Sequence, residues 1–255
     1  MTETIGARSD GGGFASVVFD CDSTLVTVEG IDELAGDRLE EIRRMTDLAM
    51  DGSVPLEEVY GRRLALIDPT REQVDAISRV YLDAVVEDAR GTVAALLWLG
   101  KDVRVVSGGL LPPVLAIAES LGIAAGAVAA VDIQFDGEGR YLGFERGSPL
   151  ARSGGKAEVV GGWTLPRPSL LVGDGATDLE ARPVVDCFVA FMGVAFREAV
   201  AAGAEVVVRS PSLSPVLARA AGVADRERLR GSPWADLLER GDRLLSSAGE
   251  EDPAT

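Results

Sequence analysis

The sequence contains no histidine, and its 255 residues include only two cysteines. Without histidine the chain cannot build a Ser-His-Asp or Cys-His catalytic system, or a zinc site with histidine ligands. The two cysteines, Cys21 and Cys187, match neither a metal-binding spacing nor a disulfide framework. Such sparse use of cysteine is typical of proteins from the reducing cytoplasm, which is the location we expect.

The chain also lacks an apolar run of membrane-spanning length, and its first residues, MTETIGARSDGGG, are too polar for a signal peptide. Its 25 lysines and arginines are outnumbered by 41 aspartates and glutamates, which gives a net charge of −16. This balance argues against nucleic acid and anionic membranes as partners, because both are bound through basic surfaces. An anionic small molecule is compatible with this charge if a local positive site binds it.

The hydrophobic pattern predicts an α/β fold, a doubly wound and mostly parallel sheet with an inserted small helical cap. The run FASVVFD, which ends at Asp20, is typical of a strand buried on both faces. Strand-like and helix-like segments alternate from residue 91 onward, and VDIQFDGEGRYLGF has the signature of a β-hairpin. We predict a catalytic core over residues 14–27 and 91–209, a helical cap over 28–90, and a helical C-terminal extension over 210–255 that ends in a flexible tail.

Polar residues follow several of the predicted strands. Asp20 and Asp22 follow the first strand, Ser107 follows DVRVV, and Asp174 follows SLLVG. Because ligands of open parallel sheets bind beyond the carboxyl ends of the strands, we expect these side chains to converge on one crevice. Asp178 in GDGATD adds another carboxylate. Such a cluster suits Mg²⁺, whose ligands are carboxylates, water and phosphate oxygens.

The same segments also allow purely structural interpretations. Taken alone, DCDST is compatible with a solvated turn, the glycines after Ser107 with a tight turn, and Lys156 in SGGK with an ordinary surface lysine. A calcium loop starting at Asp20 is excluded, because Leu25 stands where that loop needs glycine. A Walker loop is excluded, because Ala157 rather than serine or threonine follows the lysine.

Together these groups predict a phosphoryl-transfer site. One aspartate attacks phosphorus and becomes an aspartyl phosphate. Magnesium, lysine, a serine hydroxyl and backbone amides stabilise the charge of the transferred group. A second carboxylic acid protonates the leaving alcohol and then activates water.

These motifs resemble those of a known family. FDCDSTL, SGG, GGK and GDGATD occur in the order of the four signature elements of haloacid-dehalogenase-superfamily phosphatases. EGIDELA, MTDLAM, RLALI and REQV are similar to the phosphoserine phosphatase family within that superfamily, and the likeness runs from about Val17 to Val207. The resemblance implies magnesium-dependent hydrolysis of O-phospho-L-serine, a small-molecule substrate. We expect the protein to be a monomer or homodimer.

The resemblance also implies a role for each matching residue. It makes Asp20 the nucleophile and Asp22 the general acid and base. Asp174 is the further magnesium ligand, together with Asp20 and the backbone carbonyl of Asp22, and Asp178 is a supporting carboxylate. The residues expected around the phosphate are Ser107, Gly108, Gly109, Lys156 and Thr177.

The cap residues are expected to determine specificity. Phosphoserine carries an ammonium and a carboxylate, and Glu29 and Arg63 match the residues that bind them, with Met50 as an apolar wall. Asp51 stands where the family usually has glycine, and Leu56 where an aromatic residue is common. These departures leave open a same-fold phosphatase that acts on another small phosphomonoester. The intact catalytic residues argue against a binding protein without turnover, and the two cap residues argue against a phosphomutase.

Overall fold

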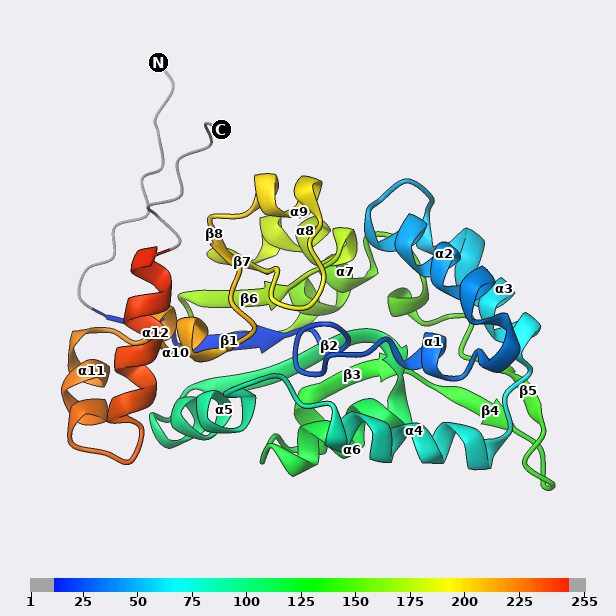
Figure 1. Ribbon diagram of the computed structural model, residues 1–255, viewed down its shortest axis with the longest axis horizontal. Coiled ribbons are helices and arrows are strands. Elements are labelled where there is room, and N and C mark those ends of the chain that lie inside the picture. Colours follow the sequence, from blue (N-terminus) through cyan, green and yellow to red (C-terminus); the bar gives the residue numbers. More distant parts are fainter. Residues whose placement is uncertain (1–11, 248–255) are drawn as a thin grey trace, which may run out of the picture.

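The computed structural model describes residues 12–247 and contains one six-stranded sheet in the order β3-β2-β1-β6-β7-β8 (Figure 1). All neighbouring strands are parallel. The three strands β1, β6 and β7 are buried along their whole length, which explains why each appears in the sequence as an uninterrupted apolar run. The strands are β1 (Ser16–Phe19), β2 (Asp102–Leu110), β3 (Val128–Val131), β6 (Ser169–Gly173), β7 (Cys187–Phe191) and β8 (Val206–Val208).

Helices cover both faces of this sheet. In Figure 1, α5 and α6 lie below it, and α7, α8 and α9 lie above it. This arrangement confirms the predicted doubly wound α/β fold, because helical crossovers between parallel strands must lie on the sheet faces. The bounds of these helices are α5 (Ala89–Trp98), α6 (Leu111–Ser120), α7 (Gly155–Gly162), α8 (Ala176–Glu180) and α9 (Glu198–Gly203).

The insertion after β1 is helical, as predicted, and lies beyond the carboxyl ends of the strands (Figure 1). It contains α1 (Gly30–Glu33), α2 (Leu39–Met50), α3 (Leu56–Ile67) and α4 (Arg71–Asp83). The two chain segments that connect it to the core lie side by side, because Val26 and Val85 form an antiparallel bridge. The last helix, α4, packs along the core helix α6. The exact division into cap and core stays a prediction.

A β-hairpin from the core supports the cap. Its strands, β4 (Ile133–Phe135) and β5 (Tyr141–Phe144), form a separate antiparallel pair, which confirms the hairpin predicted from the turn sequence. Phe144 packs on Tyr60 of α3, with 5.0 Å between the ring centroids. This contact links the hairpin to one wall of the cleft described below.

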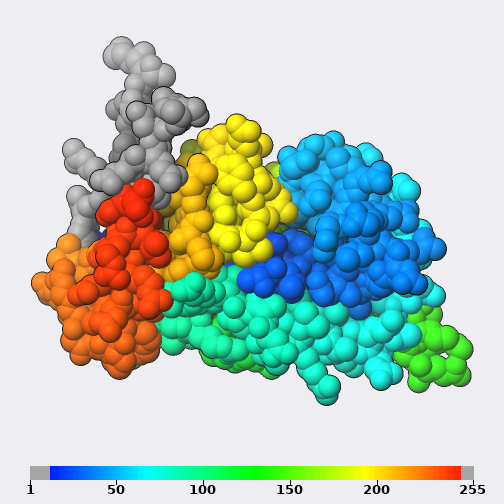
Figure 2. Space-filling view, in the orientation of Figure 1, coloured from blue at the N-terminus to red at the C-terminus, as the bar shows by residue number. Residues whose placement is uncertain are grey.

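The C-terminal segment is helical through residue 247, and it packs at the opposite end of the molecule from the cap (Figures 1 and 2). Its helices are α10 (Ser214–Ala220), α11 (Val223–Arg230) and α12 (Ala235–Ser247), with α10 lying against both α12 and α5. Leu217, Leu229 and Leu238 are buried in these contacts. The flexible tail predicted at the end lies outside the described residues. Among residues 12–247, no helix combines the length and apolar composition that crossing a membrane requires.

Candidate active site

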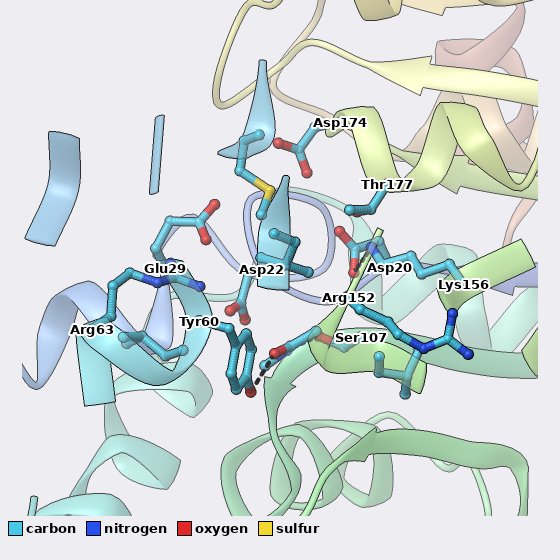
Figure 3. Close-up of a pocket in the computed structure, with 16 residues that line it drawn as sticks. Asp20, Asp22, Glu29, Tyr60, Arg63, Ser107, Arg152, Lys156, Asp174 and Thr177 are labelled. Atoms are coloured by element: carbon cyan, nitrogen blue, oxygen red, sulfur yellow. Dashed lines mark hydrogen bonds and ion pairs between the residues drawn. The ribbon is translucent and has the colours of Figure 1, made fainter. Parts of the chain in front are cut away.

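Three carboxylates, those of Asp20, Asp174 and Asp178, meet at the carboxyl edge of the sheet. Asp20 and Asp174 line a cleft between the core and the cap (Figure 3), and Asp178 lies behind its wall. Asp20 follows β1, Asp174 follows β6, and Asp178 lies in the first turn of α8. Each is at least 94% buried, and one oxygen of each lies within 4.8 Å of the others. The cleft is lined by Asp20, Asp22, Glu29, Ile31, Met50, Leu56, Tyr60, Arg63, Ser107, Gly108, Gly109, Leu150, Arg152, Lys156, Asp174 and Thr177.

Lys156 is the central counter-ion of this cluster. Its Nζ donates to Asp20 Oδ1 at 2.8 Å and to Asp178 Oδ1 at 2.7 Å. The other oxygen of Asp178 accepts the backbone N–H of Gly175 at 3.1 Å. The two carboxylates raise the pKa of the lysine against the opposing effect of burial, so it is charged at neutral pH. The interpretation of Lys156 as an ordinary surface lysine is therefore wrong.

The carboxylate of Asp22 lies apart from this trio and is bound by the cap. Oδ1 accepts a short hydrogen bond from Tyr81 of α4, and Oδ2 accepts the backbone N–H of Gly30 at 3.3 Å. Burial raises the pKa of Asp22, while both hydrogen bonds lower it. A carboxyl group whose pKa is raised toward neutrality can donate a proton and later accept one, as a general acid and base must.

Residues 107–109 form the next wall of the cleft. The Oγ of Ser107 accepts the backbone N–H of Gly109 at 2.9 Å, which leaves the hydroxyl hydrogen free to donate to a ligand. A Cβ at Gly109 would lie 3.1 Å from both Asp22 Oδ2 and Ser107 Oγ, so only glycine fits here without displacing a neighbour. Tyr60 of the cap donates to the carbonyl of Gly108 at 2.8 Å and thereby connects the cap with this wall.

The two predicted cap residues lie on the far side of Asp22 from Lys156 (Figure 3). Glu29 is half-buried and accepts the hydroxyl of Ser23 at 2.7 Å. Arg63 is 3% exposed and donates from Nη1 to Thr46 at 2.8 Å. The cleft thus has one region suited to a phosphate and a second region that is lined by the carboxyl group of Glu29 and the guanidinium group of Arg63.

The two departures from the family pattern, Asp51 and Leu56, lie in different environments. Leu56 is buried and lines the cleft, as do Met50 and Thr177. Asp51 is exposed, accepts the backbone N–H of Ser53 at 2.8 Å, and lies outside the set of residues that line the cleft in the described part of the chain. Of the two departures, only Leu56 therefore contributes to the wall of the cleft.

Several site residues escaped the sequence analysis. Arg197 pairs with Asp174, and because it lies in the loop after β7, the same strand-end argument could have found it. Tyr60 and Tyr81 occupy helical positions that look like ordinary core residues, so the sequence carried no signal for them. Arg152 lines the cleft from the segment that precedes α7.

The donors fit a magnesium ion. Asp20, Asp174 and Asp178 can each offer an oxygen within a space of 4.8 Å, and hard cations prefer such oxygen ligands. Burial raises the pKa of Asp20 well above its usual range, and it raises that of Asp174 to about 6 although Arg197 opposes this. A cation bound among these groups would offset the cost of ionising them together.

Glu29 is expected to make the stability of the ligand-free protein depend on pH. Burial, reinforced by Asp22, raises its pKa from 4.5 to about 8. The folded protein therefore retains a proton that the unfolded chain has lost, and the free energy of unfolding falls as the pH rises from 4.5 to about 8. The slope from one such group is at most about 1.4 kcal/mol per pH unit.

Urea unfolding of the wild type and of Glu29→Gln at several pH values in this range measures the effect. The variant should lose part of the downward slope. Glu33→Gln is the matched control and should keep the slope, because Glu33 is an exposed glutamate in α1, the helix that begins directly after Glu29. If the unfolding free energies of the wild type and of Glu29→Gln change with pH in parallel, Glu29 has the same pKa in the folded and unfolded states, which would contradict this prediction.

The fold and the cleft define a phosphatase of the haloacid dehalogenase class, with an acidic cluster and a buried lysine beneath a helical cap. The chain is 37% identical to phosphoserine phosphatase of Bos taurus over 198 residues, which cover 74% of this chain and 87% of the relative. It is also 37% identical to the Homo sapiens enzyme over 193 residues, covering 72% and 84%. The chain belongs to the phosphoserine phosphatase family and is a phosphoric monoester hydrolase.

Solved structures agree with this assignment. A structure described as a phospho-aspartyl intermediate analogue of phosphoserine phosphatase superposes with a TM-score of 0.71 at 27% identity, covering 80% of this chain and 98% of the other. A substrate-bound phosphoserine phosphatase complex gives a TM-score of 0.71 at 26% identity, covering 80% and 97%. No family model matches the chain.

Proposed function

We propose that this phosphatase hydrolyses O-phospho-L-serine to L-serine and phosphate through an aspartyl phosphate, with Mg²⁺ as cofactor. One observation carries the proposal: a single cleft joins the Asp20–Lys156 pair to Glu29 and Arg63. The first pair suits a phosphate, and the second suits an ammonium and a carboxylate. The relatives named above carry this activity in their names, which supports the same substrate here.

In the first step, an oxygen of Asp20 attacks phosphorus and the bond from phosphorus to the serine oxygen breaks. Lys156 holds the nucleophile in place through its 2.8 Å contact and brings a positive charge to the transferred group. The proton of Asp22 passes to the serine oxygen, so that an alcohol leaves rather than an alkoxide. Ser107 donates its free hydroxyl hydrogen to a phosphate oxygen.

In the second step, water attacks the phosphorus of the aspartyl phosphate and the bond to Asp20 breaks. Asp22, now a carboxylate, takes the proton of this water and returns to its initial form. Tyr81 and Gly30 keep its carboxyl group in place during both transfers. Asp20, Asp174 and the backbone carbonyl of Asp22 would hold the magnesium ion, with Asp178 in support. When bound, the ion supplies positive charge for the phosphate oxygens.

Glu29 and Arg63 bind the ammonium and the carboxylate of the substrate, and Met50 forms an apolar wall beside them. Leu56 favours a second candidate, a phosphatase for another small phosphomonoester, because it lines the cleft where the family commonly has an aromatic residue. The free cysteines, Cys21 and Cys187, are both buried and suit a cytoplasmic enzyme.

Phosphate release tests these proposals. O-phospho-L-serine, phosphoethanolamine and a sugar phosphate are each offered at equal concentration, with excess Mg²⁺ or with EDTA. Phosphoserine should be preferred by kcat/KM, and EDTA should abolish its hydrolysis until Mg²⁺ is restored. Equal use of phosphoserine and the sugar phosphate would favour the second candidate, and full activity in EDTA would contradict the magnesium requirement.

A further inference from the structure

Arg63 is held in an unusual way for a buried charge. Its side chain is 3% exposed, and its Nη1 donates to Thr46 of α2 at 2.8 Å. Its Nε is also buried but has no hydrogen-bond partner among residues 12–247. A buried donor without an acceptor costs free energy, so this N–H favours a ligand that brings one.

The free donors of Arg63 lie on one edge of the guanidinium group. A carboxylate pairs with guanidinium through two parallel N–H donors along one edge. Thr46 accepts a hydrogen bond from Nη1. The edge formed by Nε and Nη2 therefore keeps both of its N–H donors for a ligand. Figure 3 shows Arg63 extending toward Glu29 and Asp22, which also line the cleft. The arrangement therefore leaves a bidentate edge for a carboxylate.

Thr46 can hold Arg63 in this orientation only if the hydroxyl group of Thr46 is itself fixed. A hydroxyl has one hydrogen to donate, and that of Thr46 forms a short hydrogen bond with Asp32 Oδ1. A longer contact of 3.2 Å joins the same hydroxyl to the carbonyl of Ile42. With its hydrogen directed to the carboxylate, the oxygen presents a lone pair to Arg63.

Asp32 is the last residue of this hydrogen-bonded chain, and its buried carboxylate is the counter-charge to Arg63. It is 4% exposed and lies on α1, whereas Thr46 lies on α2 and Arg63 on α3. The hydroxyl therefore links three cap helices and connects two opposite charges that do not touch directly. Such a chain of hydrogen bonds inside a low-dielectric region restricts side-chain orientation more than an isolated contact does.

We propose that Thr46 and Asp32 are positioning residues, which orient Arg63 so that its Nε–Nη2 edge binds the substrate carboxylate. This inference rests on the proposed function, in which Arg63 contacts that carboxylate. Neither Thr46 nor Asp32 lines the cleft, so each acts through the arginine rather than through the substrate.

The test compares O-phospho-L-serine with phosphoethanolamine, which lacks the carboxylate. Thr46→Val removes the hydroxyl with little change in volume, and Thr46→Ser restores it. The ratio of kcat/KM for the two substrates should fall about ten-fold in Thr46→Val, chiefly through KM for phosphoserine, and should recover in Thr46→Ser. Asp32→Asn should reduce the ratio by a smaller factor, because its amide oxygen can still accept from Thr46.

Two further variants distinguish a failure of the proposed function from a failure of this inference. Arg63→Ala should reduce the ratio most; an unchanged ratio there would overturn the carboxylate contact in the proposed function. If Arg63→Ala behaves as expected but Thr46→Val slows both substrates equally, Thr46 has only a structural role and the inference is wrong. Thr92→Val, which removes another buried hydroxyl in α5, is the control and should leave the ratio unchanged. Should Thr46→Val fail to fold, a wild-type ratio in Asp32→Asn would equally overturn the inference.

Discussion

Asp20→Asn is expected to lower kcat by about 10⁴-fold or more while leaving the protein folded. The amide has nearly the shape of the carboxylate and can still accept from Lys156, but it is a very poor nucleophile toward phosphorus. Burial and the neighbouring Asp178 already raise the pKa of Asp20, so removing its charge relieves repulsion. The melting temperature should therefore stay the same or rise, which distinguishes lost chemistry from lost structure.

The measurement is single-turnover and steady-state phosphate release, with a thermal melt of the same sample. Asp225→Asn is the matched control, because Asp225 also pairs with a lysine, Lys101, at 2.8 Å but lies away from the cleft. It should retain wild-type kcat. A residual rate in Asp20→Asn within ten-fold of the wild type would contradict nucleophilic attack by this residue.

The sequence predicted the sheet and its carboxyl edge because both follow from short-range rules. A buried parallel strand is a continuous apolar run, and its last polar residue must face the crevice beyond the sheet. This rule places Asp20 and Asp174 correctly at the ends of β1 and β6. Ser107 was expected after its strand but lies inside β2, which continues to Leu110, and it lines the same cleft. The resemblance to a family then supplied roles that no local pattern contains, such as the one for Arg63.

Two elements were missed for physical reasons. The edge strand β3 has the sequence VAAV, and alanine has little preference for strands, so only its pairing with β2 identifies it. The helix α11 is strongly polar and was not recognised, because the hydrophobic periodicity that marks an amphipathic helix is nearly absent from it.

The contacts that tune the site could not be predicted from the sequence. Tyr81 and Asp22 are 59 residues apart, and Thr46 and Arg63 lie on different helices of the cap. In the sequence each is a reasonable core or surface residue of its own helix. Only the packing of the cap helices against one another and against the sheet brings these polar groups within hydrogen-bonding distance.

Lys156→Met is expected to reduce the free energy of unfolding by roughly 3–5 kcal/mol at pH 7, besides lowering kcat. The methionine fills a similar volume, but it leaves Asp20 and Asp178 buried without their shared cation. The pKa of Lys156 is raised above its usual 10.5 in the folded state, so its stabilising effect is fully present at pH 7 and is lost only in strong base. The deficit should shrink as the pH falls, because Asp20 can then take up a proton.

Lys101→Met provides the matched comparison for this stability change. Its side chain is also nearly buried, with 7% exposure, but it pairs with one carboxylate, Asp225, which is 19% exposed. Water can solvate that carboxylate once the lysine is gone, so we expect a smaller loss than in Lys156→Met. Urea unfolding of both variants at pH 5 and pH 7 gives the two differences. Two results would show that the acidic cluster does not depend on Lys156 as its counter-ion. One is an equal loss of unfolding free energy in the two variants. The other is a loss in Lys156→Met that does not diminish at pH 5.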